Sequence, residues 1–123
     1  MSDQAWKRGA VAEQLAAAYL ESQGLRILAR NLRCKLGELD LVCLDRGVLA
    51  IVEVRQRMRI DYGGALASVD HRKQRKLMRA ARYFLLRRAA WRGLMMRFDV
   101  VGVQGPAEGP QHIVWIKDAF RSI

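Results

Sequence analysis

Long apolar stretches are missing from this sequence of 123 residues. No run of about 18 or more apolar residues occurs, so no membrane-spanning helix is predicted. The first residues, MSDQAWKRG, lack the apolar core and the small-residue cleavage site of a secretory signal. We therefore expect the whole chain to be the mature protein, to lie in the cytoplasm and to make no use of a membrane.

Cysteine and histidine are also scarce, with two residues of each type in the chain. Such a set does not build the four-ligand site of a structural zinc ion or a framework of disulfides. Cys34 and Cys43 are instead expected to be small, buried side chains on strands. The fold must then depend on its apolar core, and 51% hydrophobic residues are sufficient for a single domain over residues 1–123.

Acidic residues are absent from one long basic stretch. The chain holds 22 Lys and Arg against 12 Asp and Glu, a net charge of +10. Nine of these cations, and no acid, lie in residues 71–92. Cations three or four residues apart on a helix repel one another, and cations in its first turn oppose the helix dipole. The stretch therefore predicts a helix that binds an anionic ligand.

Nucleic acid is the favoured ligand for this helix, because a basic stripe on one element is the electrostatic footprint of phosphate binding. The residues expected to follow the phosphate backbone are Arg72, Lys73, Arg75, Lys76, Arg79 and Arg82. A solvated basic face and an acidic protein partner are the alternatives. A helix lying on a membrane would need a wider free apolar face than this one has.

The apolar pattern predicts an α/β fold in which helices flank a mixed β-sheet. Helical spacing is found in residues 3–23 and 70–91, and strand-like patterns in residues 25–33, 38–44, 48–54, 97–103 and 113–116. A tight turn at residues 45–47 predicts an antiparallel pair of strands on either side of it. Residues 58–68 have no period and are expected to form a loop, and residues 118–123 a last helical turn.

Two carboxylates lie on the strands that this turn connects. Asp40 belongs to GELDLV and Glu53 to IVEVRQR, so the hairpin can bring both side chains to one face, with Arg55 on the same face as Glu53. Glu53 lies in an apolar run, where a charge is costly unless it is paired or bound to a metal. Carboxylate oxygens suit Mg²⁺ or Mn²⁺, which can bind a phosphodiester and lower the pKa of a bound water. Glu13 could add a third carboxylate; two acids on a solvated sheet face are the alternative.

Several motifs occur in an order that resembles a known group of proteins. They are GAVAEQLAAAYL, GELDLV, IVEVRQR, the Lys73-Gln74 pair in a helix that contains AARYFL, RFDVV and the final KDAF. Over nearly the whole chain this order resembles the YraN-type family of bacterial proteins. That family looks like a branch of the PD-(D/E)XK nuclease superfamily, with a restriction-endonuclease-like fold similar to that of archaeal Holliday junction resolvases.

The resemblance implies a site made of an acid from the first helix, an Asp and a Glu-x-Lys motif. Carried over to this chain, the candidate catalytic residues are Glu13, Asp40, Glu53, Arg55 and Gln56, with Asp40 and Glu53 as ligands of Mg²⁺ or Mn²⁺. Arg55 stands where the motif has lysine. A guanidinium stays protonated, so it can hold phosphate or stabilise charge but cannot give up a proton.

Two hypotheses about function follow from this departure. The chain is either a metal-dependent endonuclease that acts on branched or recombining DNA, or a protein that binds nucleic acid through a site that has lost its chemistry. A homodimer would suit a twofold-symmetric junction. Asp99, in the RFDVV motif, either faces the site or is held by Arg97 for structural reasons.

Overall fold

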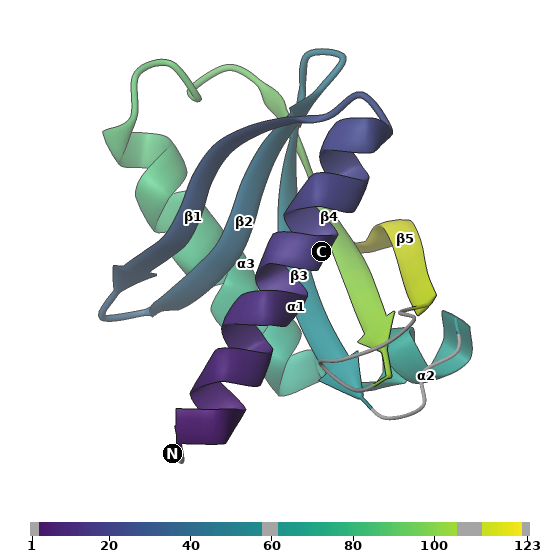
Figure 1. Ribbon diagram of the computed structural model, residues 1–123. Coiled ribbons are helices and arrows are strands. Elements are labelled where there is room, and N and C mark those ends of the chain that lie inside the picture. Colours follow the sequence, from purple (N-terminus) through teal and green to yellow (C-terminus); the bar gives the residue numbers. More distant parts are fainter. Residues whose placement is uncertain (1–2, 58–61, 106–111, 122–123) are drawn as a thin grey trace.

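The computed structural model describes residues 3–57, 62–105 and 112–121. A five-stranded sheet with the order β1-β2-β3-β4-β5 forms its centre (Figure 1). The strands are β1 (Arg26–Cys34), β2 (Gly37–Asp45), β3 (Val48–Arg57), β4 (Met95–Gln104) and β5 (His112–Phe120). The helices are α1 (Asp3–Ser22), α2 (Tyr62–Ala67) and α3 (His71–Arg87). The predicted mixed sheet is confirmed, since β3 and β4 are parallel and the other neighbouring strands are antiparallel.

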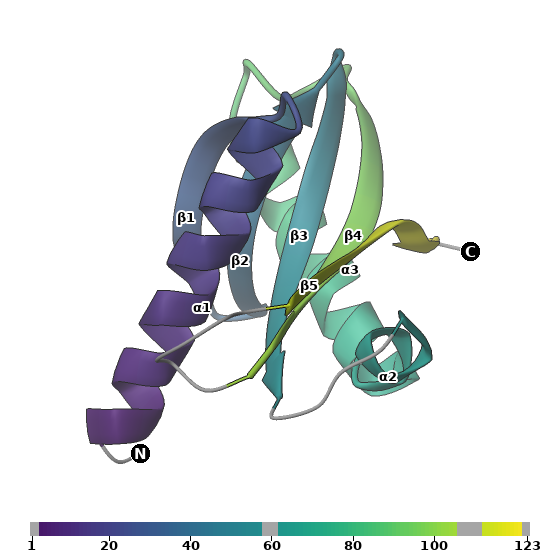
Figure 2. The ribbon, with the colours of Figure 1, turned by 45° about the vertical axis from the view of Figure 1, so that its right-hand side comes forward.

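The sheet is covered on both faces. Helix α1 lies on one face, whereas α2 and α3 lie on the other (Figure 2). The α1 side buries Ala16 and Leu20 against Leu41 and Val52, and the α3 side forms a second apolar cluster. Strands that are buried on both faces have near-continuous apolar sequences, which explains the run at the start of β3. None of the helices in the described part of the chain is long and apolar enough to cross a membrane.

The hairpin of β2 and β3 forms at the predicted turn. Arg46 and Gly47 have φ values of 50° and 83°, which is the left-handed pair that a two-residue hairpin turn requires. The register places Asp45 opposite Val48 and Leu41 opposite Val52. Cys34 and Cys43 lie on β1 and β2 as free thiols, the first half-buried and the second fully buried.

The prediction of a loop over residues 58–68 is wrong for its second half. Residues 58–61 lie outside the described part of the chain, and α2 follows at Tyr62–Ala67. Ala65 is completely buried and Leu66 packs on the same apolar cluster. The two glycines of α2 weaken its helix propensity, so burial against the sheet decides the local structure.

Two further boundaries differ from the sequence prediction. Helix α3 ends at Arg87, because the chain then turns back toward β4 and buries Trp91 in the core. The predicted helical turn at residue 118 is wrong, since Asp118 and Phe120 belong to β5. Phe120 stacks on Phe98 of β4 at 5.1 Å between ring centroids, which keeps the last residues of β5 against the sheet. Residues 122–123 of this prediction lie outside the described chain.

Candidate functional site

The candidate site lies where β2 and β3 separate. Their backbone pairing ends at Leu41 and Val52, and the Asp40 side chain takes over by accepting a hydrogen bond from the Val54 amide (N to Oδ2, 2.9 Å). Leu39 packs on the α3 side whereas Leu41 packs on the α1 side. Residues two apart in a regular strand share a face, so β2 is twisted or kinked at Asp40.

The neighbouring strand is irregular at the same level. Arg30 pairs with Leu41 and Leu32 with Leu39, which leaves Asn31 opposite Asp40. Asn31 has a φ of 52°, in the left-handed region that asparagine tolerates better than most residues. Strained backbone of this kind is typical of sites where a side chain must be aimed in a particular direction.

Glu53 is the most deeply buried acid of the cluster, with 4% of its side chain exposed. Burial, followed by the charge of Asp40, raises its pKa from 4.5 to about 7, although Lys73 and Arg55 oppose the rise. Its Oε2 atom is buried and has no hydrogen-bond partner among the described residues. The pKa of Asp40 is also raised, above all by burial, against the effect of the Val54 hydrogen bond. The structure therefore brings Asp40 and Glu53 together, as expected from the hairpin in the sequence.

Glu13 approaches this pair from α1. Burial and the charges of Asp40 and Glu38 raise the pKa of Glu13 to about 7, while a hydrogen bond with Asn31 acts in the opposite direction. Its Oε1 atom is buried without a partner in the described structure. The third carboxylate expected from the sequence thus lies within electrostatic reach of Asp40.

Two cations flank Glu53. Lys73, in the first turn of α3, places its Nζ 3.6 Å from Glu53 Oε1. Arg55 places its Nε 3.9 Å from the same oxygen, but its Nη2 donates to the Ser68 carbonyl at 3.0 Å. The Lys73 side chain is 36% exposed and that of Arg55 22%, so the ammonium is the more accessible of the two charges. The sequence analysis assigned Lys73 only to the residues that follow the phosphate backbone. In the structure it is the third residue of α3 and lies next to the buried Glu53, so it also belongs to the carboxylate cluster.

The remaining predicted residues lie apart from this cluster or have another role. Gln56 follows Arg55 on β3 and therefore faces the α1 side, and its backbone carbonyl accepts a bond from Arg57. Asp99 is completely buried and accepts bonds from the Arg97 guanidinium, the Trp115 indole and the Asp118 amide. These contacts favour the alternative that Arg97 holds Asp99 for structural reasons.

The outer face of α3 carries the other predicted phosphate contacts. Arg72, Arg75, Lys76, Arg79 and Arg82 are all exposed. Asp70 caps the helix by accepting a bond from the Lys73 amide at 2.8 Å. Because the helix begins beside Glu53, a basic surface leads from the carboxylate cluster along α3.

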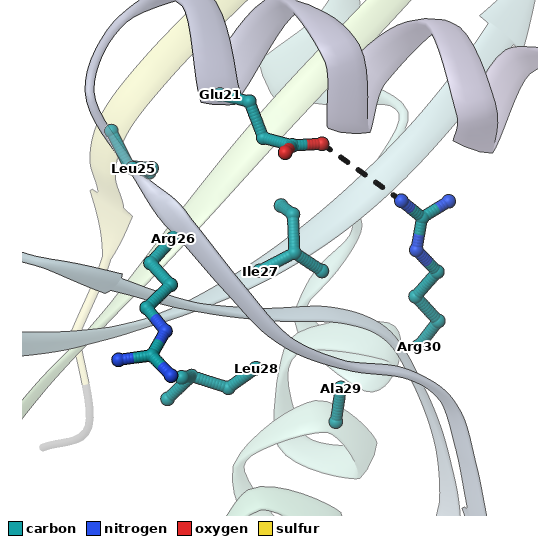
Figure 3. Close-up of a pocket in the computed structure, with 7 residues that line it drawn as sticks. All are labelled: Glu21, Leu25, Arg26, Ile27, Leu28, Ala29 and Arg30. Carbon is teal, nitrogen blue, oxygen red and sulfur yellow. Dashed lines mark ion pairs between the residues drawn. The ribbon is translucent and has the colours of Figure 1, made fainter.

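A separate hollow of about 540 Å³ lies between the end of α1 and β1 (Figure 3). Glu21 and Arg30 point toward each other across it, with 4.0 Å between Oε1 and Nη2. Both side chains are about half exposed, and Ile27 lies beneath them. Surface pairs of this kind contribute little to binding or stability, so this hollow is a weaker candidate than the carboxylate cluster.

The donor set of the cluster fits a hard divalent cation. Among the described residues, no group of three or more His, Cys, Asp or Glu is arranged to hold a metal by side chains alone. Mg²⁺, however, usually binds through one or two carboxylates together with water and substrate phosphate. Asp40 and Glu53 supply two carboxylates, and the unpartnered Glu53 Oε2 is the kind of atom that such an ion would satisfy.

Fold and site together define a mixed α/β protein with a buried carboxylate cluster beside a basic helix. The family model described as "Uncharacterised protein family UPF0102" matches residues 12–103, and the chain belongs to this family. The UPF0102 protein of Pseudomonas putida strain W619 is 49% identical over 113 residues, which are 92% of each chain. That of Halorhodospira halophila is 50% identical over 115 residues, which are 94% of this chain and 88% of the relative. The family resemblance carried by the sequence motifs is thereby confirmed.

Proposed function

We propose that this protein has the PD-(D/E)XK nuclease fold, binds DNA and hydrolyses its phosphodiester bonds with Mg²⁺ or Mn²⁺. The observation that carries the proposal is Glu53, a carboxylate that is 4% exposed and keeps one oxygen without a hydrogen bond. It lies beside Asp40 at the open end of the β2 and β3 pair.

Three desolvated carboxylates in one region oppose folding unless a cation offsets their charge. The two neighbouring cations do not satisfy Glu53 fully, because its pKa is still raised in their presence. A purely structural site would be expected to pair every buried oxygen. The excess of negative charge therefore supports a site for an additional cation.

Asp40 and Glu53 would hold this ion. A divalent metal bound there supplies a water of lowered pKa and offsets the charge that develops on the phosphate. The other residues of the chain act around it. Lys73 can bind a phosphate oxygen through its exposed ammonium, and the basic surface of α3 can hold the neighbouring phosphates.

Arg55 contributes differently from the lysine of the family motif. Its guanidinium connects Glu53 to the Ser68 carbonyl and so holds the chain just before α3. The Lys73 amine occupies the other side of Glu53. A lysine is thus present at the carboxylates, supplied by a helix in place of the strand, and this supports catalysis over the alternative of a site that only binds.

The test is incubation of the purified protein with a labelled four-way DNA junction and a matching linear duplex. Mg²⁺, Mn²⁺ and a chelator are compared, and the twofold junction would also reveal a homodimer by the size of the complex. Glu53→Gln and Asp40→Asn are the site variants, and Glu21→Gln is the matched control on the surface.

Metal-dependent cleavage that is lost in both site variants and kept in the control is the expected result. Retarded but intact DNA with all four proteins would establish binding without chemistry. Neither retardation nor cleavage at low salt would overturn the proposal, because phosphate binding is strongest there.

A further inference from the structure

A groove of about 500 Å³ lies between α3 and the start of β4, apart from the carboxylate cluster. Helix α3 packs chiefly on β2, while α2 packs on β4 and β5, and the groove lies beside the first residues of β4. Apolar side chains form its floor, and arginines form its rim. The floor residues are Met78, Leu85, Leu86, Met96 and Phe98, and the rim residues are Arg75, Arg79 and Arg82.

Part of the apolar floor is accessible to solvent. Among the floor residues, Leu86 is 56% exposed, whereas Phe98 is 3% exposed. The side chains of Met78, Leu85 and Met96 are half-buried. Exposed apolar side chains that lie together and have a polar rim are typical of a surface that binds another protein.

Among the described residues, the rim arginines have no ion-pair partner. Arg75, Arg79 and Arg82 are spaced four and three residues apart, so they lie along one side of α3. Arg87, by contrast, lies over the Tyr83 ring at 3.6 Å from its centroid.

We propose that this groove binds an acidic segment of a partner protein, which inserts one large apolar side chain between its own carboxylates. The floor takes the apolar side chain and the three guanidiniums take the carboxylates, which they can bind in a bidentate manner. A nucleic-acid backbone would satisfy the arginines but would bring no apolar group to bury on Met78, Leu86 and Met96. The peptide is therefore the occupant that uses both parts of the groove.

This groove does not include the carboxylates of the proposed nuclease, but Arg75, Arg79 and Arg82 belong to both the groove and the proposed phosphate-binding surface. Arg82 follows Lys73 by nine residues on the same helix, which separates them by about 13 Å along its axis. A partner seated in the groove would cover arginines that were predicted to follow phosphate. It would leave Lys73 and the carboxylate cluster open.

The test measures binding of an array of fluorescein-labelled peptides, each with two acidic residues on either side of one central Leu, Ile, Met, Phe or Trp. A second array carries serine at the centre. Leu86→Ser and Arg82→Gln are the groove variants. Leu36→Ser changes another exposed apolar side chain, and Arg92→Gln another exposed arginine, so these two serve as matched controls.

We expect at least one apolar-centred peptide to bind, and each groove variant to weaken its affinity about tenfold, the effect of one anchoring contact. The control variants should change it less than about twofold. If no peptide binds at concentrations up to about 1 mM, the proposal is overturned, because a specific site should bind with a Kd below that value. Equal binding of the serine-centred peptides, unaffected by Leu86→Ser, would also overturn it, because general attraction to a basic helix would then be the cause.

Discussion

Replacing Glu53 by glutamine keeps the size of a side chain that is 4% exposed and removes its charge. In the folded protein the pKa of this carboxyl is about 7, compared with 4.5 as its ordinary value. The folded state therefore binds the proton more tightly than the unfolded chain does. The contribution of this proton to folding stability is fully present below about pH 4.5 and is lost as the pH rises through about 7.

The size of this effect on stability follows from the difference between the two pKa values, which corresponds to about 3 kcal/mol. Glu53→Gln should thus stabilise the metal-free protein by about 2 to 3 kcal/mol at pH 8.5 and by about zero at pH 4.5. Urea unfolding with a chelator present measures the free energy of unfolding at both values. Glu21→Gln, an exposed acid, should change it by less than about 0.5 kcal/mol at either pH.

Destabilisation by Glu53→Gln at the higher pH would refute this reasoning. It would mean that Lys73 and Arg55 fully satisfy the carboxylate, so that Glu53 belongs to a structural ion-pair network. The charge excess that supports a metal site would then be gone, and the proposed nuclease activity would lose its main argument.

Three further expectations concern the same cluster and the network beside it. In Lys73→Met the pKa of Glu53 should rise above about 7, because the Lys73 ammonium lowers it. ¹³C NMR of labelled carboxyl groups measures this pKa. An unchanged value would mean that the pair at 3.6 Å has no effect on Glu53. Mn²⁺ at a hundredfold excess over its Kd should raise the free energy of unfolding of the wild type by about 2.7 kcal/mol at pH 8. The same addition should not stabilise Asp40→Asn. A thermal-shift assay compares the two proteins, and equal stabilisation would mean that the ion binds elsewhere. Asp99→Ala should cost about 3 kcal/mol in urea unfolding, because Arg97 would lose its completely buried carboxylate partner and keep its pair with Asp45. A loss below about 1 kcal/mol would contradict this role of Asp99.

The meeting of Asp40 and Glu53 could be predicted from sequence because it depends on local information. Arg46 and Gly47 fix the hairpin, and the two-residue period of the strands then sets which side chains share a face. The kink at Asp40 was not predictable in the same way. It involves Asn31 on the neighbouring strand, whose left-handed φ has no signal in the apolar pattern.

Long-range burial decided the other differences between sequence and structure. Helix α2 contains two glycines and no amphipathic period, and it forms where Ala65 and Leu66 can pack on the sheet. The end of α3 is set by Trp91, which reaches the core only after the chain has left the helix. Periodicity along the chain gives no information on such packing, since the partners are distant in sequence.

The role of Arg55 in the structure also depends on long-range contacts. Arg55 is long enough to contact Glu53 and to donate to the Ser68 carbonyl at the same time. Ser68 lies two residues before Asp70, whose side chain caps α3 by binding the Lys73 amide. Arg55 thereby supports the segment from which Lys73 reaches Glu53. Under the proposed function, α3 in place of the strand supplies the amine, because Lys73 lies beside the Glu53 carboxylate.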